Sequence, residues 1–179
     1  MHHIIIDGTS WPVFEDELFK LYRGEELPPL AFDHQDYAVW QAEHGDPRAQ
    51  EAVFKEMFAD GAPENEMPTY ASRPEILPHA DEDILRIIPK QKIRETAKRL
   101  GVTQYGLLMS VLGMTLGKYC ASQDVVIGTA MSGRTLEEQS SMIGMFVNTL
   151  PIRMKPAGDM RLKDYVVQTA QTIRTVKAN

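Results

Sequence analysis

The sequence predicts an α/β fold, in which short strands alternate with helices. Compact β-branched runs, HHIII (2–6) and ILRII (84–88), are typical of buried strands. Segments with apolar residues at helical spacing stand between such runs, and they begin and end at residues that commonly cap helices. Strands that alternate with helices indicate helices layered on a sheet.

The first part of the chain, residues 1–59, is expected to hold one strand and three helices. The strand 2–6 ends at Asp7-Gly8, where the chain can turn. Each following helix has a capping residue at its start, and two of them end at a glycine. The expected helices run from Thr9 or Ser10 to Gly24, from Asp33 to Gln41, and from Asp46 to Gly61 with Pro47 in its first position.

Residues 60–83 differ in composition from the segments on either side. The stretch is polar, and four prolines interrupt any regular element. Uninterrupted helices and strands are therefore not expected here. We interpret residues 60–83 as a crossing or linker between two lobes.

The second part, residues 84–179, alternates strands and helices. Thr103 is expected to cap a helix whose apolar residues suggest near-total burial, and Pro89 and Gly101 are expected to delimit the helix before it. The expected elements are a strand at 84–88, helices at 89–101 and 103–119, strands at 124–133 and 145–154, and a helix at 161–177; the buried residues of the 103–119 helix are Leu107, Leu108, Val111, Leu112, Leu116 and Tyr119.

Composition narrows the possible functions. A length of 179 residues suits one domain or two small lobes. The net charge of −6 argues against a nucleic-acid partner, which needs clustered Lys and Arg. The single cysteine, Cys120, excludes an intrachain disulfide and fits a cytoplasmic setting. No apolar run approaches the roughly 20 residues of a membrane helix, so no membrane association is expected.

The histidine pair at the start is the first candidate for chemistry. On a strand, His2 and His3 point to opposite faces, which disfavours a chelating metal pair. One imidazole facing a cleft is a base suited to neutral pH. Amides near Gly8 would favour a developing negative charge. The same residues are also compatible with a purely structural pair.

Four segments resemble motifs of the condensation domains of nonribosomal peptide synthetases. MHHIIIDGTSW (1–11) is similar to the family's core motif, MHHxxxDGxS, at every defined position. The remaining three segments follow in the family's order: DYAVWQ (36–41), DVVIGTAMSGR (124–134) and IGMFVNTLPIR (143–153).

The resemblance implies a partial chloramphenicol-acetyltransferase-like two-lobe fold, with a mixed sheet and packed helices. Family members are considerably longer than this chain, so we expect a truncated central portion. By resemblance, residues 1–59 end the N-terminal lobe, and residues 84–179 form part of the C-terminal lobe. The isolated chain is expected to be nearly inactive and to self-associate through exposed apolar faces.

Matching motif positions imply roles for individual residues. His3 matches the catalytic histidine, which either deprotonates the acceptor amine or stabilises the tetrahedral intermediate, and His2 matches a supporting one. Asp7 matches an aspartate in an ion pair, although a simple helix cap is the competing interpretation. The Gly8 amide matches one that lies near the reacting carbonyl. The expected partner of Asp7 is Arg134, with Arg153 in reserve, and Asn148 is a weaker candidate that needs a hydrogen-bond partner in mid-strand.

The implied activity is peptide-bond formation between aminoacyl or peptidyl thioesters held by carrier proteins. The expected partners are upstream and downstream peptidyl carrier proteins and an adjacent adenylation domain. Their phosphopantetheine arms are tethered substrates, so no resident cofactor, metal or ATP is expected. A coenzyme-A-dependent acyltransferase and an epimerisation-type relative are rival interpretations, which DYAVWQ and VNTLP disfavour.

Overall fold

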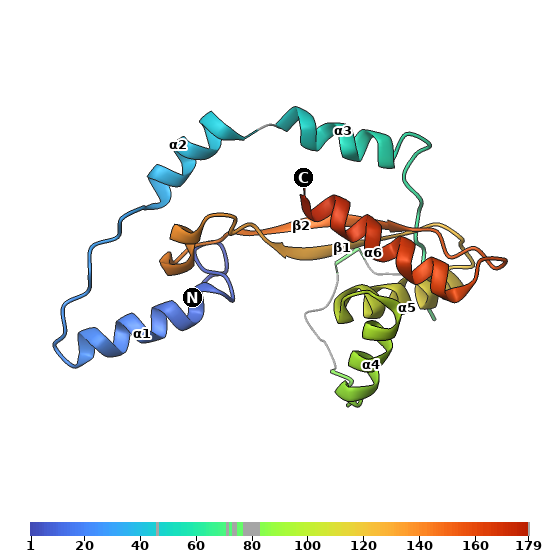
Figure 1. Cartoon of the computed structure of the whole chain (residues 1–179), viewed down its shortest axis with the longest axis horizontal. Coiled ribbons are helices and arrows are strands. Elements are labelled where there is room, and N and C mark those ends of the chain that lie inside the picture. Colours follow the sequence, from blue (N-terminus) through green and yellow to red (C-terminus); the bar gives the residue numbers. More distant parts are fainter. Residues whose placement is uncertain (46, 71, 73–74, 77–82, 179) are drawn as a thin grey trace. The chain divides into compact units, whose positions relative to one another are not determined.

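The structure is a computed structural model that describes residues 1–45, 47–70, 72, 75–76 and 83–178. Figure 1 shows the elements in chain order. The helices are α1 (Ser10–Tyr22), α2 (His34–His44), α3 (Pro47–Met57), α4 (Lys90–Leu100), α5 (Gln104–Tyr119), the 3₁₀ helix η1 (Glu137–Ser141) and α6 (Leu162–Ala178); the strands are β1 (Val125–Ser132) and β2 (Val147–Met154).

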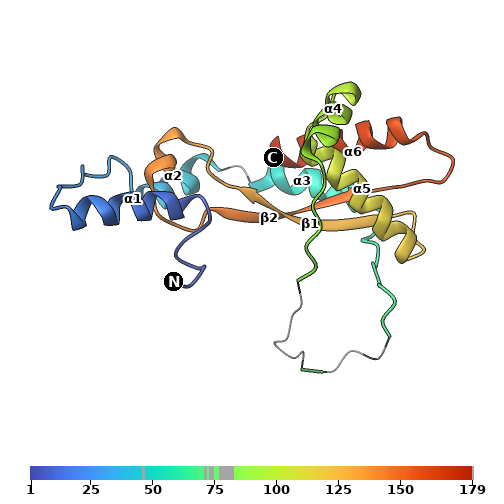
Figure 2. The ribbon, with the colours of Figure 1, turned by 90° about the horizontal axis from the view of Figure 1, so that it is seen from below.

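The strands β1 and β2 form an antiparallel pair. The amide of Gly133 donates to the carbonyl of Phe146 at 2.8 Å, which joins the end of β1 to the start of β2. The two strands run side by side over their length (Figure 2). The predicted α/β class is confirmed, and the sheet of the described residues has two antiparallel strands rather than a mixed arrangement.

The described residues divide into two compact units. The first comprises Met1–Ala52 with Thr129–Leu150, and the second comprises Val53–Gly128 with Pro151–Asn179. The first unit buries polar side chains as well as apolar ones. The buried residues of the first unit are Ile6, Met142, Phe146, Asp7, Ser10, Thr129, Gln139 and Gly144.

In the second unit, α4, α5 and α6 pack on one another (Figure 1). The small residues of α5 face its neighbours: a Cβ on Gly106 would lie 3.4 Å from the Ala170 Cβ, and one on Gly113 would lie 2.7 Å from the Met154 Sδ. The predicted burial of the large residues of this helix is wrong, because close packing selects the small face instead. Four of them are exposed: Leu108, Val111, Leu112 and Tyr119.

The strands predicted at 2–6 and 84–88 are also wrong. Residues 3–5 form a turn, and residues 84–88 belong to no strand. Ile84 and Ile87 are 85% and 91% exposed. A strand needs a neighbour to bind its amides and carbonyls, and within the described ranges only β1 and β2 pair with each other. A β-branched composition does not provide that neighbour.

Several local helix signals are confirmed, but the predicted cap of the first helix is wrong: Thr9 makes no side-chain cap hydrogen bond and Ser10 already lies in α1. The Asp33 side chain accepts from the Gln35 and Asp36 amides at the start of α2. Thr103 accepts from the Gly106 amide at 3.0 Å, and Gly101 ends α4 with φ of 69°. The predicted cap Asp46 lies outside the described residues. Among the helices described, none alone is long and apolar enough to cross a membrane, although α4 and α5 pass on length and composition as a pair bent by 96°.

Candidate functional site

The two adjacent histidines lie in a tight turn before α1. The Ile5 amide donates to the His2 carbonyl at 3.2 Å, and the Ile4 amide donates to His2 Nδ1 at 3.1 Å. Because Nδ1 accepts, a neutral His2 ring carries its proton on Nε2. His2 and His3 are both exposed and lie in a turn, not on opposite faces of a strand as the sequence predicts. An exposed imidazole at His3 is accessible to a substrate.

Asp7 is 4% exposed and is surrounded by donors. Its Oδ1 accepts from the Ser10 amide at 2.8 Å and from Arg134 Nη2 at 3.1 Å. Its Oδ2 accepts from the Phe146 amide at 3.1 Å. The ion pair with Arg134 is therefore present, and Asp7 also caps the start of α1. The ion pair and the helix cap, which the sequence presents as competing roles, are both found.

Ser10 is fully buried at the first residue of α1. Its Oγ lies 2.7 Å from Asp7 Oδ1 and 2.9 Å from the Gly144 carbonyl, and its one hydrogen serves one of these acceptors at a time. The same Oγ accepts from the Gly144 amide at 3.0 Å and from Arg134 Nη2 at 2.7 Å. Ser10 thus ties the start of α1 to the segment before β2.

Arg134 follows β1, and its side chain is 7% exposed. Its Nη1 donates to the carbonyl of Gln139 and to that of Met142, the latter at 3.0 Å. Its guanidinium carbon lies 4.3 Å from the centroid of the Phe146 ring. Contacts to a carboxylate, to carbonyls and to an aromatic face hold a planar guanidinium in one orientation.

The protonation state of Asp7 follows from these contacts. Burial raises the pKa of its carboxyl. The hydrogen bonds from Ser10, Arg134 and the Phe146 amide outweigh burial and lower the pKa to about 2. Asp7 is therefore ionised at neutral pH, with its oxygens occupied. A carboxylate in this state is poorly matched to proton transfer near pH 7, which favours a structural role.

Gly8 and Asn148 are both exposed. A Cβ on Gly8 would meet no atom within 4 Å. Close approach of a substrate carbonyl to the Gly8 amide stays a prediction. Asn148 lies on β2 where water reaches its amide. Because Asn148 is exposed to water, it does not need the protein hydrogen-bond partner that its mid-strand position led us to expect.

Arg153 does not serve as the reserve partner of Asp7. Its Nε donates to the Asp124 carboxylate at 2.9 and 3.1 Å, and its Nη1 donates to Asp60 Oδ1 at 2.5 Å. The Asp124 and Asp60 carboxylates raise the pKa of Arg153. In turn, Arg153 and then Lys155 lower the pKa of Asp60 to about 2. Arg153 therefore joins β2 to residues near the end of α3, and its charge is neutralised.

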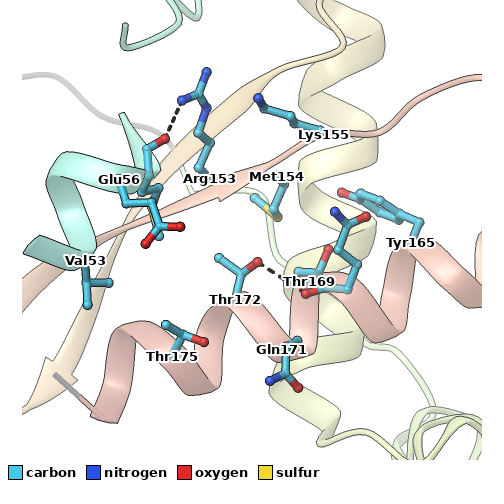
Figure 3. Close-up of a pocket in the computed structure, with 12 residues that line it drawn as sticks. Val53, Glu56, Arg153, Met154, Lys155, Tyr165, Thr169, Gln171, Thr172 and Thr175 are labelled. Carbon is cyan, nitrogen blue, oxygen red and sulfur yellow. Dashed lines mark hydrogen bonds between the residues drawn. The ribbon is translucent and has the colours of Figure 1, made fainter. Parts of the chain in front are cut away.

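A cavity of about 460 Å³ lies in the second unit, between α3, β2 and α6 (Figure 3). Glu56 comes from α3, Lys155 follows β2, and threonines line the α6 side (Figure 3). Of the site residues predicted from the sequence, its lining includes only Arg153. The part of the chain that the structure describes holds no cluster of three or more His, Cys, Asp or Glu placed to bind a metal ion.

Sequence reasoning missed several residues of the Asp7 network. From the sequence, Ser10 is only a motif position and a possible cap. Gly144 and Phe146 lie in the segment IGMFVNT, in which Asn148 alone is a predicted site residue. The Phe146 ring also stacks on His34 at 4.8 Å. Phe146 could have been identified as a site residue from its position in that motif segment. Gln139 lies in a polar stretch, and nothing in the sequence around it indicates a role in the network.

Comparison with known proteins shows that the condensation-domain family model matches residues 1–179. Tyrocidine synthase 3 of Brevibacillus parabrevis is 33% identical over 175 residues, which cover 94% of this chain and 3% of the synthase. The solved complex of the X-domain and OxyB from teicoplanin biosynthesis gives a TM-score of 0.84 at 26% identity, over 99% of this chain and 43% of that chain. The first condensation domain of the CDA synthetase gives a TM-score of 0.74 at 23% identity, over 99% of this chain and 42% of that chain, and shows likeness of fold alone. This chain therefore spans a small part of the synthase and less than half of each solved chain.

Proposed function

Because the chain belongs to the condensation-domain family, we propose that it takes part in amide-bond formation during nonribosomal peptide synthesis. The amine of a downstream aminoacyl thioester attacks the carbonyl carbon of an upstream aminoacyl or peptidyl thioester. A C–N bond forms, the C–S bond breaks, and the upstream phosphopantetheine arm leaves as a thiol that takes up the proton lost by the amine. The observation that carries the proposal is the buried hydrogen-bond network of Asp7, Ser10 and Arg134, which fixes the chain shortly after the exposed His3.

His3 is the proposed catalytic residue. Its imidazole either takes the proton from the attacking amine or stabilises the tetrahedral intermediate. His2 is a supporting residue, because its Nδ1 accepts from the Ile4 amide and is occupied by the turn. The Gly8 amide is proposed to face the reacting carbonyl. Asp7 and Arg134 hold the backbone that carries these groups.

The proposed partners are upstream and downstream peptidyl carrier proteins and an adjacent adenylation domain. Their phosphopantetheine arms enter as substrates, and the thioester is already activated. Residues 1–59 are proposed to end the N-terminal lobe, residues 60–83 to cross between lobes, and residues 84–179 to belong to the C-terminal lobe. A role in antibiotic biosynthesis and secondary metabolism is proposed together with this reaction, since the chain is similar to tyrocidine synthase 3. The lone Cys120 supports a cytoplasmic location.

A second candidate is that the chain alone is catalytically inactive and self-associates. The exposed apolar residues of α5 and of 84–88 support it, because contiguous apolar surface favours association. An assay of amide product with loaded carrier proteins, with light scattering on the same sample, decides the question. Robust turnover by a monomer would reject this candidate.

Two rival activities within the same superfamily are disfavoured by the motif segments. A coenzyme-A-dependent acyltransferase does not account for DYAVWQ (36–41), and an epimerisation-type relative does not account for VNTLP (147–151). Both segments favour condensation.

The role of His3 is tested in a protein that carries residues 1–179 together with the remainder of a condensation domain. His3→Ala should lower product formation by about 10²-fold or more, the usual contribution of a general acid or base. The thermal midpoint should not change, because His3 is exposed. His2→Ala is the matched control for the turn. Equal turnover of His3→Ala and the unaltered protein at matched folding would overturn the assignment.

A further inference from the structure

We propose that Gln139 is a positioning residue, which shapes the loop after β1 so that Arg134 reaches Asp7 and Ser10. The consequence for catalysis rests on the proposed function, since Asp7 and Ser10 fix the backbone that follows His3. The contacts of Gln139 with the loop and with Arg134 do not depend on that function. Through these contacts, one buried amide sets the direction of a guanidinium.

The Gln139 side chain closes the loop immediately after Arg134. Gln139 is fully buried. Its Oε1 accepts from the Thr135 amide at 2.6 Å and from the Leu136 amide at 2.8 Å. One oxygen thus serves the first two backbone amides after Arg134. The side chain therefore fixes the path of the chain away from Arg134.

The Gln139 backbone holds the guanidinium itself. Its carbonyl accepts from Arg134 Nη1, as does the Met142 carbonyl at 3.0 Å. The loop thus turns back on its own first residue and occupies Nη1. This leaves Nη2 for Asp7 Oδ1 at 3.1 Å and for Ser10 Oγ at 2.7 Å. The side chain and the backbone carbonyl of Gln139 together orient the Arg134 guanidinium toward Asp7 and Ser10.

This loop uses only the oxygen of the Gln139 side-chain amide. Gln139 Nε2 and Arg134 Nε are both buried with no hydrogen-bond partner among the described residues. The acceptor oxygen is therefore the atom of Gln139 that this loop uses. A carboxylate would supply the same acceptor with a negative charge, in a loop whose arginine pairs with Asp7. Glutamine supplies the acceptor without competing for Arg134.

The experiment follows the carboxyl titration of Asp7 by ¹³C NMR in the chain and its folded variants. Gln139→Met keeps the side-chain length and removes the acceptor. It should raise the titration midpoint of Asp7 from about 2 part of the way toward 3.8, because Arg134 is no longer aimed at the carboxylate. In an Arg134→Met background, Gln139→Met should add no further shift. Gln171→Met, at an exposed glutamine of α6, is the control and should leave the midpoint unchanged.

A role limited to closing the loop predicts a different result. In that case a folded Gln139→Met leaves the Asp7 midpoint where it is, or shifts it equally with and without Arg134, and either outcome overturns the proposal. If Gln139→Met does not fold, Gln139→Asn replaces it, since the shorter amide reaches less far. The same upward shift is then expected, and no shift overturns the proposal. None of these measurements depends on amide product, so failure of the His3 assay would refute the proposed function alone.

Discussion

Replacement of Ser10 by alanine should lower the free energy of unfolding by about 1.5–4 kcal/mol. Ser10 Oγ is fully buried between Asp7, Arg134 and Gly144. In the variant, the Gly144 amide loses its acceptor, and a buried donor without a partner costs about 1–3 kcal/mol. The hydrogen bond of the hydroxyl to Asp7 or Gly144 adds about 1 kcal/mol. Alanine recovers at most about 0.5 kcal/mol through its higher helix propensity in α1.

Equilibrium unfolding in urea, followed by circular dichroism, measures this loss. Ser140→Ala is the matched control, because Ser140 is exposed in η1 and its removal should change stability by less than about 0.5 kcal/mol. The slope of the urea dependence should be the same in both variants, which would place the effect in the folded state. If Ser10→Ala unfolds at the same urea concentration as Ser140→Ala, the hydroxyl does not hold the network and the reasoning fails.

Three further outcomes follow from the same network and from β2. The pKa of Asp7 in the folded chain is about 2, against an ordinary 3.8, so its ionised form contributes about 2 kcal/mol to the free energy of unfolding. This contribution is complete above pH 3.8 and is lost as the pH falls through about 2. Asp7→Asn should remove this part of the dependence of stability on pH, and an unchanged pH profile of stability would contradict the prediction. Gly144→Ala should destabilise the chain by about 1–3 kcal/mol, since the new Cβ would collide with the His34 ring and lie 2.9 Å from a Phe146 ring carbon. Adding His34→Ala to this variant should restore part of the lost thermal stability, and no recovery would rule out the collision. Arg153→Met should lower the thermal midpoint more than a change at an exposed arginine, because it removes the buried cation that joins Asp60 and Asp124 and leaves them only the half-exposed Lys155. Equal midpoints would refute this.

The sequence predicted local features far better than distant contacts. The caps at Asp33 and Thr103 depend on residues within one helical turn, so they could be read from spacing. The pairing of Asp7 with Arg134 joins residues 127 positions apart and came only through motif resemblance. The strand at 84–88 was wrong because its hydrogen bonds would need a partner that local composition does not specify.

Burial of polar residues was the least predictable feature. Gln139 stands among glutamates and serines, in a stretch whose composition indicates solvent exposure. Its burial follows from a loop that returns to its own arginine, which no periodicity reveals. In α5, large and small residues alternate around the helix, and the sequence alone did not show which face would meet α6.

Four polar groups lie around the oxygen of Ser10. Two N–H groups point toward it, from Gly144 and Arg134, and two acceptors, on Asp7 and Gly144, compete for its single hydrogen. Rotation about one C–O bond moves that hydrogen between them while every heavy atom stays in place. When acid neutralises Asp7, its carboxyl becomes the weaker acceptor. The hydrogen is then expected to turn to the Gly144 carbonyl, which would couple the charge of one carboxylate to a peptide group far along the chain.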